Sequence, residues 1–304
     1  MPDRDAVIVD GVRTPIGKRR GALADQHAVD LSAHVLGALA ERNGLDPALV
    51  DDVIWGCVHP VGQQSGNVGR LAVLAAGWPE AVPGTTIDRQ CGSSQQSIHF
   101  AAATDSGAFA SQITPVPLAD GLALTADEGL RRGTTAERLA GLKPAFKADG
   151  VIHAGNSSQV SDGAAALLMM TSERARELGL NPVARVHTAV LAGDDPVFML
   201  TAPIPATARA LSRSGLSLDD IGVYEVNEAF APVPMAWLRE TGADTARLNP
   251  NGGAIAMGHP LGASGARIMT TLINHMRDNG IRYGLQTMCE GGGMANATIV
   301  ELLP

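Results

Sequence analysis

The sequence predicts an α/β protein made of two similar halves. Two observations carry this prediction: short apolar runs alternate with helical patterns, and both halves follow the order strand, helix, strand, helix, strand, helix. Alternation of this kind is typical of layered α/β folds with largely parallel strands. The second half then ends in two strand-like runs joined by glycines, whereas the first half has none after its third helix. We therefore expect a duplicated fold whose first copy lacks its last strands.

Apolar and β-branched runs set the expected elements of the first half. One helix ends before Gly44, since glycine after an apolar helical pattern is a common stop signal. A later helix is expected from Cys91 to about residue 103, so Cys91 stands at a junction between strand and helix. The other expected elements are strands at residues 6–9, 53–57 and 85–88, and helices at residues 31–43 and 66–76.

The second half repeats this order and then closes with the hairpin. Pro232 and Pro234 are expected to interrupt a helix near its start, because proline lacks a backbone N–H. The glycine run after Cys289 predicts the tight turn of a hairpin. The expected strands are residues 183–190, 221–226, 283–289 and 294–303, and the expected helices are 206–214, 228–241 and one ending near residue 278.

Composition and charge exclude several classes of function. Apolar residues make up 45% of the chain and charged residues 18%, which supports a large buried core. The net charge is −8 and no run of Lys and Arg exceeds three residues, so nucleic-acid binding is not expected. No apolar stretch reaches the ~18–20 residues of a membrane span. The 3 cysteines form no CxxC pair, which argues against a disulfide framework or a structural metal and favours a reduced, cytoplasmic setting.

Cys91 is the first candidate for chemistry. A free thiol ionises near pH ~8.5, so only a small fraction is thiolate at neutral pH. A helix N-terminus stabilises the anion by roughly 0.3–1 kcal/mol, and Gly92 and Ser93 leave room for a substrate carbonyl. The alternative is a buried, inert cysteine, which is the commoner fate of a single cysteine.

Two further candidates lie in the second half. Pro260 biases His259 away from a helix, so the ring is expected on a turn where it could act as general base for a thiol. It could equally be a turn histidine with a satisfied hydrogen bond. Cys289 stands where a strand meets three glycines, whose N–H groups can bind an anion, or the hairpin could be purely structural. Glu290 beside it is expected to be solvated.

Polar turn residues complete the candidates. Asn227 follows a strand and could cap the next helix, or it could hold a water or a carbonyl in a cleft. Asn156 and Ser158 form another turn cluster with the same two interpretations.

Taken together, five segments resemble the thiolase family in their order and spacing, from VRTPIGK near the start to the final strand. The matching segments are DRQCGSSQQ, HAGNSSQVSDGAAA, VNEAFA, NGGAIAMGHPLGASGAR and CEGGGMANA. Each is modest alone, but their agreement over nearly the whole chain is specific. The resemblance implies a duplicated α/β/α layered fold with mixed sheets and a truncated loop domain.

The resemblance also implies a role for each matching residue. Cys91 matches the nucleophile that becomes acylated, and His259 matches the base that activates it. Cys289 matches the second thiol, which moves a proton to or from the α-carbon of the acetyl unit. Asn227 matches the residue that holds a water in one oxyanion hole with His259, and the N–H groups of Cys91 and Gly291 match a second hole. Contacts with coenzyme A are implied for Phe146, Ser158, Phe230 and, by a looser match, Arg131.

One departure from the family concerns length. After Ala103 the chain passes directly to a sequence that resembles a downstream part of the family, so roughly 85 residues are absent. Either the protein carries a true deletion, or the given sequence omits these residues. The expected organisation is an N-terminal half at 1–103, a remnant of the loop domain at 104–180, and a C-terminal half at 181–304.

The resemblance implies an acyl-CoA acyltransferase, either a 3-ketoacyl-CoA thiolase or an acetyl-CoA acetyltransferase. Coenzyme A would be a substrate, with no metal or other cofactor. A homodimer is expected, and a tetramer less so without the loop. Two alternatives stay open: a decarboxylating enzyme of the ketoacyl-synthase type, whose site resembles Cys–His–His, and an acyl-CoA-binding remnant without catalysis if the deletion is real.

Overall fold

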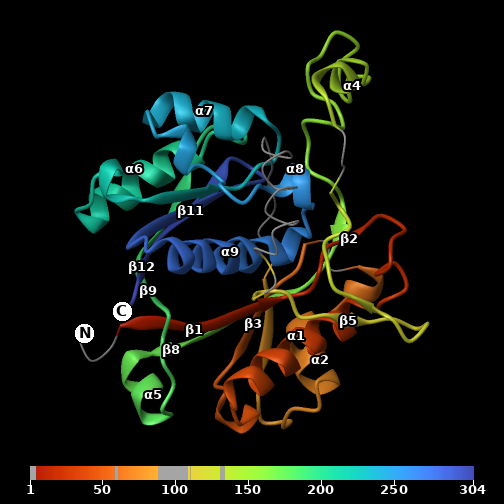
Figure 1. The fold of residues 1–304 in the computed structure, drawn as a ribbon, viewed down its shortest axis with the longest axis vertical. Helices are drawn as coiled ribbons and strands as arrows, with labels where there is room; N and C mark the ends of the chain where they lie inside the picture. The colour runs from red at the N-terminus through yellow and green to blue at the C-terminus, as the bar shows by residue number, and fades with distance from the viewer. Residues whose placement is uncertain (1–4, 59–60, 88–108, 110, 131–133) are drawn as a thin grey trace.

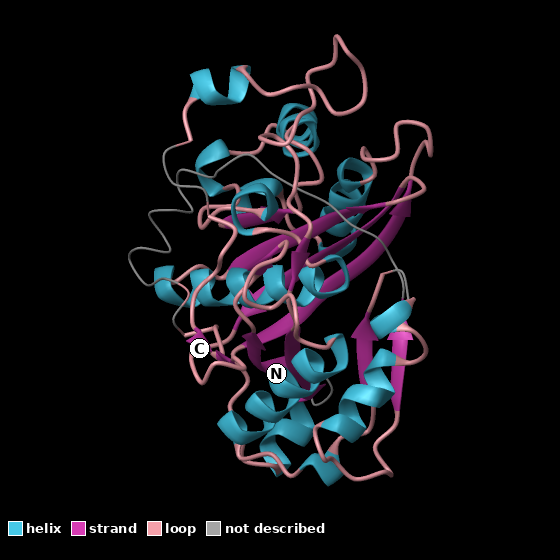
Figure 2. Ribbon diagram, turned by 90° about the vertical axis from the view of Figure 1, so that its right-hand side faces the viewer, coloured by secondary structure: helices cyan, strands magenta, loops and turns pink. Residues whose placement is uncertain are grey.

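The computed structural model describes residues 5–58, 61–87, 109, 111–130 and 134–304. Its elements follow the expected order, with helices on both faces of a twisted central sheet (Figures 1 and 2). The main strands are β1 (Ala6–Arg13), β3 (Val53–Gly56), β4 (Gly84–Ile87), β8 (Ala165–Thr171), β9 (Ala184–Gly193), β10 (Val223–Val226), β11 (Tyr283–Glu290) and β12 (Met294–Leu302). The main helices are α1 (Ala28–Asn43), α2 (Val68–Ala75), α6 (Pro203–Ser214), α7 (Pro232–Thr241) and α9 (Ser264–Asn279).

Shorter elements lie in the connections. A segment that projects from the body carries a short helix, α4 (Ala136–Ala140), at its end (Figure 1). The others are β2 (Gly17–Lys18), β5 (Val116–Pro117), β6 (Ala123–Leu124), β7 (Ser161–Asp162), α5 (Ser172–Glu177) and α8 (Ala254–Met257), with 3₁₀ turns at Pro47–Leu49, Gly62–Gln64, Leu218–Asp220, Thr245–Arg247 and Leu261–Ala263. Within the described residues, no helix is long and apolar enough to cross a membrane.

The central sheet has six strands in the order β10-β11-β12-β9-β1-β8. Only β10 and β11 run parallel in this sheet, and the remaining neighbours are antiparallel. The expectation of largely parallel strands is therefore wrong here. The reason is connectivity: β11 and β12 form a hairpin, and the two halves of the chain meet through the antiparallel contact of β1 with β9.

The second half forms a complete layered unit. On one face, α6 and α7 pack on the sheet through small side chains and through Trp237, which is fully buried. On the other face, α9 packs through apolar side chains such as Leu272 and Met276. The expected interruption by prolines is also wrong, because Pro232 occupies the first turn of α7, where a missing N–H costs no helical hydrogen bond.

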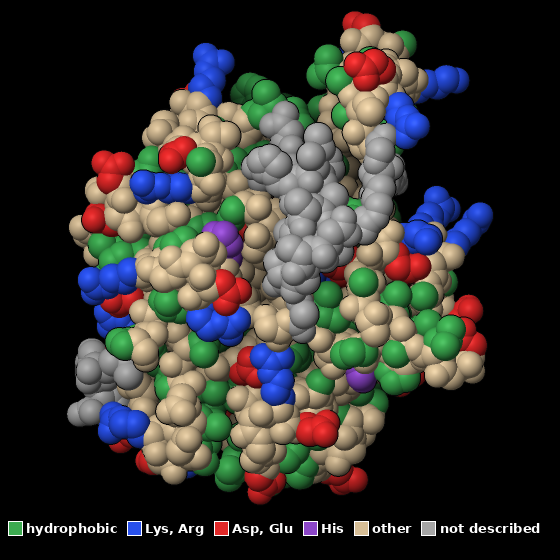
Figure 3. Space-filling view, viewed as in Figure 1, with side chains coloured by type: hydrophobic (Ala, Val, Ile, Leu, Met, Phe, Trp, Pro, Cys, Tyr) green, Lys and Arg blue, Asp and Glu red, His purple; other side chains and the backbone are tan. Residues whose placement is uncertain are grey.

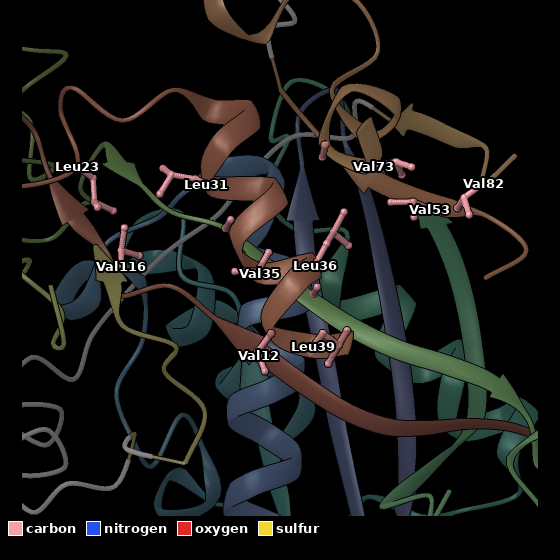
Figure 4. Packing of buried hydrophobic residues seen from close by; sticks show 13 residues of the cluster. Val12, Leu23, Leu31, Val35, Leu36, Leu39, Val53, Val73, Val82 and Val116 are labelled. Carbon is pink, nitrogen blue, oxygen red and sulfur yellow. The ribbon is translucent and has the colours of Figure 1, made fainter. Parts of the chain in front are cut away.

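The first half is less continuous. Its strands β3 and β4 pair with each other in a separate parallel sheet, and β8, within the segment 104–180, joins the main sheet beside β1. The first half was expected to lack its last strands, but β8 is such a strand and is present. Helix α1 packs against both the β3–β4 pair and the β1–β8 pair. Its Leu36 shares one core cluster with Val53 of β3 and Ala166 of β8 (Figure 4).

A buried ion pair joins β1 to the segment before α4. Arg13 donates to both carboxylate oxygens of Asp127, at 2.6 and 2.9 Å, and neither side chain is exposed. Asp127 also accepts from the Ile16 N–H at 2.8 Å, and Arg13 donates to Gln112. A buried pair satisfied in this way holds the surrounding chain in one arrangement, because loss of either partner leaves an uncompensated charge.

We expect Asp127→Ala to lower the free energy of unfolding by about 3–5 kcal/mol, since it strands the buried Arg13 charge. The exposed pair of Arg174 with Glu177 provides the control, and Glu177→Ala should cost less than about 1 kcal/mol. Urea denaturation of the two variants measures the difference. Equal, small losses in both would contradict a structural role for the Arg13–Asp127 pair.

Candidate active site

Two of the expected site residues meet where the parallel strands β10 and β11 end. Asn227 follows β10, and its N–H donates to the Thr287 carbonyl of β11 at 2.9 Å. The Cys289 thiol lies 3.8 Å from the Asn227 carbonyl oxygen, as a weak donor. Cys289 is fully buried in an apolar cluster that includes Ala229 and Phe230. The strand pairing therefore brings Asn227 and Cys289 together.

The chain around Asn227 is fixed by a buried amide. Asn249 accepts from the Val226 N–H at 2.8 Å, donates to the Val226 carbonyl at 3.0 Å, and donates to Glu228 at 2.7 Å. Its side chain thus continues the pairing of β10 beyond the last strand residue. Gly253 is required beside it, because a Cβ there would lie 1.5 Å from a Glu228 oxygen. This arrangement determines where the backbone of Asn227 lies.

His259 lies on the turn that the sequence predicts, between α8 and α9. Its backbone N–H donates to the Gln159 carbonyl and to the Ser161 hydroxyl, each at 3.1 Å. Gly258 before it has a φ of 105°, and a Cβ there would meet the Ser161 hydroxyl at 2.2 Å. Glycine is needed for both reasons. The Gln159 amide donates to the carbonyls of Gly129 and Ile255, so the whole turn is held from one side.

The hydrogen bonds of Ser264 fix the tautomer of His259. The Ser264 hydroxyl has one proton, which it donates to the Pro260 carbonyl at 3.0 Å. The same oxygen lies 2.6 Å from Nδ1 of His259, and it can accept a proton from Nδ1 when its own proton is directed to Pro260. Nε2 is then the nitrogen with a lone pair. The ring is thereby oriented as a base.

Burial keeps this ring neutral. His259 is almost fully buried, and desolvation, with a smaller contribution from the charge of Arg267, lowers its pKa to about 3. At physiological pH the ring accepts a proton only if a nearby negative charge compensates the new positive one. Two buried acid groups lie in the same region: burial raises the pKa of Glu225 to about 8, and Glu228 is also buried.

The segment Asn156–Ser161 joins the two parts of the site. At one end, Ser157 pairs with Phe230, and the Asn156 carbonyl accepts from the Ala231 N–H at 3.0 Å. At the other end, Val160 pairs with His259. The three Cα-to-Cα steps from Ser157 to Val160 span at most about 11 Å. The stretch at Phe230, which lies in the cluster of Cys289, and the turn that bears His259 are therefore bonded to the same short segment.

A cavity of about 360 Å³ opens beside His259. Ser158 lines it together with residues after β3 and before β8. Near it, Phe146 is 73% exposed and stands edge-on to Phe230, with ring centres 5.8 Å apart. The half-buried Gly291 begins the turn after β11. The expected contacts Ser158, Phe146 and Phe230 thus lie around the same segment, Asn156–Ser161.

Other expectations have different outcomes. Cys91 and Arg131 lie outside the described residues, and so does the predicted helix that begins at Cys91. Glu290 is buried rather than solvated, because Asn296 on the next strand donates to it at 2.9 Å. Successive side chains of a strand point to opposite faces, so Glu290 points away from the Cys289 thiol. No cluster of acidic, His or Cys side chains suited to a metal occurs among the described residues.

Sequence reasoning missed the residues that orient the site. Ser264 and Gln159 both lie in quoted motifs, but the Ser264 contact depends on the conformation of the turn, and the partners of Gln159 are distant in sequence. The spacing of proline and glycine after His259 indicates a turn. The hydroxyl of Ser264, five residues after His259, is the signal that could have suggested a partner for the ring.

The lowered pKa of His259 has a defined effect on stability. The unfolded histidine binds a proton near pH 6.5 and the folded one only near pH 3, so stability falls as pH falls through this range. Between pH 7.5 and pH 5 the free energy of unfolding of the wild type should fall by about 2 kcal/mol through His259, and His259→Gln should remove this part of the fall. Urea denaturation at both values measures it.

Glu225→Gln is the matched control, because Glu225 changes the pH dependence of stability in the direction opposite to His259. The folded Glu225 keeps its proton up to about pH 8, whereas the unfolded carboxyl loses it near 4.5, so the wild type loses stability as pH rises. An unchanged pH dependence in His259→Gln would mean that the ring is solvated in solution.

Comparisons with known proteins show the family to which the chain is similar. The family description "Thiolase, C-terminal domain" matches residues 180–302, and "Thiolase, N-terminal domain" matches in two pieces, at 6–103 and 99–173. The steroid 3-ketoacyl-CoA thiolase of Mycobacterium tuberculosis is 42% identical over 387 positions, covering 98% of this chain and 94% of that protein. A 3-ketoacyl-CoA thiolase of Escherichia coli is 39% identical, covering 97% and 98%.

The fold is likewise similar to a solved structure. The acetyl-CoA acetyltransferase of Bacillus anthracis superposes with a TM-score of 0.94 at 31% identity, covering 99% of both chains. The alignment with the Mycobacterium protein has 387 positions and this chain only 304 residues, so that relative carries residues without a counterpart here. The two pieces of the N-terminal match meet at residues 99–103, next to Ala103. The chain belongs to the thiolase family of enzymes.

Proposed function

We propose that the protein is an acyl-CoA acyltransferase that forms a thioester at Cys91. It would cleave 3-ketoacyl-CoA with coenzyme A, or catalyse the reverse condensation. The observation that carries this proposal is His259, a buried neutral ring whose Nδ1–H is held by Ser264 at 2.6 Å so that Nε2 is the base. The similarity to proteins named 3-ketoacyl-CoA thiolase supports the substrate class.

In the first step, Nε2 of His259 takes the thiol proton of Cys91. The resulting thiolate and the imidazolium stabilise each other, which compensates the cost of charging a buried ring. The thiolate attacks the ketone carbon of the substrate, and the oxyanion forms near donors such as the Gly291 N–H. Each well-placed donor at an oxyanion contributes roughly 3–4 kcal/mol.

In the second step, the bond between the α-carbon and the former ketone carbon breaks. Its electron pair passes to the α-carbon of the departing acetyl-CoA, and the Cys289 thiol supplies the proton. Full burial of Cys289 in an apolar cluster supports this role, because burial favours the protonated thiol over the thiolate. Coenzyme A then gives its thiol proton to the Cys289 thiolate and attacks the acyl group on Cys91.

The coenzyme is proposed to reach the site along Phe146, Phe230 and Ser158, with Arg131 nearer the nucleotide. An exposed aromatic ring in edge contact with a second ring offers apolar surface to the pantetheine chain. Ser158 lines the cavity beside His259 and offers a hydroxyl to its amide groups.

A second candidate is binding of acyl-CoA without catalysis. The observation that favours it is the length of the alignment, because the relatives carry residues that this chain lacks in its N-terminal half. It predicts binding of coenzyme A without turnover. Loss of the ketoacyl absorbance of acetoacetyl-CoA in the presence of coenzyme A separates the two candidates.

We expect Cys91→Ala to lower turnover in this assay by at least about 10³-fold, because no acyl-enzyme can form. Val197→Ala is the control, since Val197 is 89% exposed and does not line the cavity beside His259, and it should leave turnover within a few-fold of the wild type. Iodoacetamide should label Cys91 first. Turnover that survives Cys91→Ala would end the acyl-enzyme proposal.

Ser264→Ala should lower kcat by about 10–100-fold with little change in KM, because the ring loses the partner that fixes its tautomer. Ser264→Thr, which keeps a hydroxyl, should restore part of the rate. Ser214→Ala removes a hydroxyl that bonds only near the end of α6 and is the control. An unchanged kcat in Ser264→Ala would show that the Ser264 hydroxyl is dispensable for orienting the base.

A further inference from the structure

One buried charge near the site takes no part in the proposed chemistry. On the face shown in Figure 3, Lys and Arg side chains lie at the surface among Asp and Glu, where water screens their charges. Arg267 on α9 differs from them, because only 2% of its surface is exposed. A charge is costly to remove from water, and a buried one changes the proton affinity of groups close to it. Arg267 is therefore a candidate for a role in the reaction.

The contacts of Arg267 place it beside the turn that bears His259. Ser264, whose hydroxyl lies 2.6 Å from Nδ1 of His259, is three residues before Arg267 on α9, so the two side chains occupy neighbouring positions on one face of the helix. Nη1 of Arg267 donates to the sulfur of Met257 at 3.7 Å, and only Gly258 separates Met257 from His259. The guanidinium is thus held next to this turn by the helix after it and by α8 before it.

Four other charged groups lie around the guanidinium. Arg13 and Asp127 bond to each other at 2.6 and 2.9 Å, so their charges largely cancel. Glu225 on β10 and Glu228 just after it are both buried, and both favour the charged form of Arg267. Burial raises the pKa of Glu225 to about 8 against the opposing effect of Arg267, and the charge of Glu228 adds to this rise. Glu225 is therefore neutral in acid solution, whereas Arg267 is charged.

The charge of Arg267 acts on the ring of His259. Burial is the larger cause of the lowered pKa of His259, and the charge of Arg267 lowers it further. The sulfur of Met257 is a weak acceptor, so it does not cancel this charge as a bonded carboxylate would. Arginine suits the position, because a guanidinium keeps its charge when buried, whereas a buried lysine loses its proton more readily.

This effect is largest while Cys91 is acylated. In the proposed mechanism the ring then holds the thiol proton, but the thiolate that balanced the ring has become a neutral thioester. Two positive charges, the imidazolium and Arg267, therefore lie close together. Their repulsion favours transfer of the proton back to the sulfur of Cys91 when coenzyme A takes the acyl group and this sulfur leaves as a thiolate.

We propose that Arg267 is a positioning residue of the reaction: its buried charge keeps the ring of His259 free of a proton in the resting enzyme and makes the ring return the Cys91 proton at the end of acyl transfer. This inference rests on the proposed function and assigns a further residue to it. Loss of the charge should make the ring a stronger base and a weaker acid, so the two half-reactions should respond differently.

The first measurement is the titration of the His259 ring. In protein with ¹³C-labelled histidine, NMR follows the ring from pH 8 to pH 4, and His259→Gln identifies the signal by its loss. The wild-type ring should stay neutral over this range, since its pKa is about 3. In Arg267→Met the midpoint should move up by about one pH unit, a tenfold rise in proton affinity, because a buried unit charge has been removed.

The second measurement separates the two half-reactions. Acetoacetyl-CoA without added coenzyme A forms the acetyl-enzyme, and coenzyme A added afterwards removes the acetyl group; rapid quenching follows each step. In Arg267→Met the first step should stay within about threefold of the wild type, whereas the second should slow by about 3–10-fold, because the ring releases its proton less readily. A damaged site would slow both steps.

Three variants serve as controls. Arg267→Lys carries a charge at acid pH and should restore the wild-type titration of the ring. Glu225→Gln disturbs the same cluster but replaces a neutral group by another in acid solution, so the titration should be unchanged. Arg277→Met removes a half-exposed charge about 15 Å farther along α9 and should also leave the titration unchanged.

Urea denaturation checks that each variant is folded. Should Arg267→Met not fold, its combination with Glu228→Gln replaces it, because removal of a buried cation together with a neighbouring carboxyl is tolerated better than removal of the cation alone. An unchanged ring titration in the variant without the charge would overturn the proposal, as would equal slowing of both half-reactions. A wild type that forms no acetyl-enzyme would contradict the proposed function instead, and the ring titration would still decide whether Arg267 acts on His259.

Discussion

The site depends on the backbone pairing of Asn156–Ser161 with two other parts of the chain. This segment bonds to the stretch that follows β10 and to the turn that bears His259. Neither of those stretches is a regular strand at the point of contact, so their relative position is set by single hydrogen bonds and by glycines that permit close approach. Gly258 and Gly253 each lie where any side chain would collide with a polar group of the site.

Buried charge surrounds this arrangement. Arg267 is fully buried, and burial and the charge of Arg13 lower its pKa to about 10, so it remains charged at neutral pH. Its charge lowers the pKa of His259, and it also lowers that of Glu225, against the larger raising effect of burial. The ring is thus set between a fixed cation and carboxyl groups that can hold protons. Such a site responds strongly to a new negative charge, because charges interact more strongly in a buried environment than in water.

Much of the fold follows from the sequence, and the exceptions have physical reasons. The strands at β3, β11 and β12 and the ends of α1 and α6 agree with apolar periodicity and with glycine stop signals. The antiparallel pairing of β1 could not be predicted in this way. Its partners β8 and β9 are distant in sequence, and no local pattern encodes them. Pro232 begins α7 instead of interrupting a helix, because a proline in a first turn and a proline inside a helix look alike in sequence. The motifs indicate His259, Cys289 and Asn227 as site residues, whereas the contact of Ser264 with His259 depends on the folded turn.

The position of β1 also constrains how the chain can fold. Ala6 pairs with Thr171, and Val7 with Arg185, so β1 has no partner in the sheet until β8 has been made. Contacts between residues so distant in sequence form slowly, since closing a long loop costs entropy before any pairing is gained. A strand of buried valines and isoleucine must stay soluble during that time. The central sheet is therefore assembled late, and chaperones that shield apolar strands would act on β1 first.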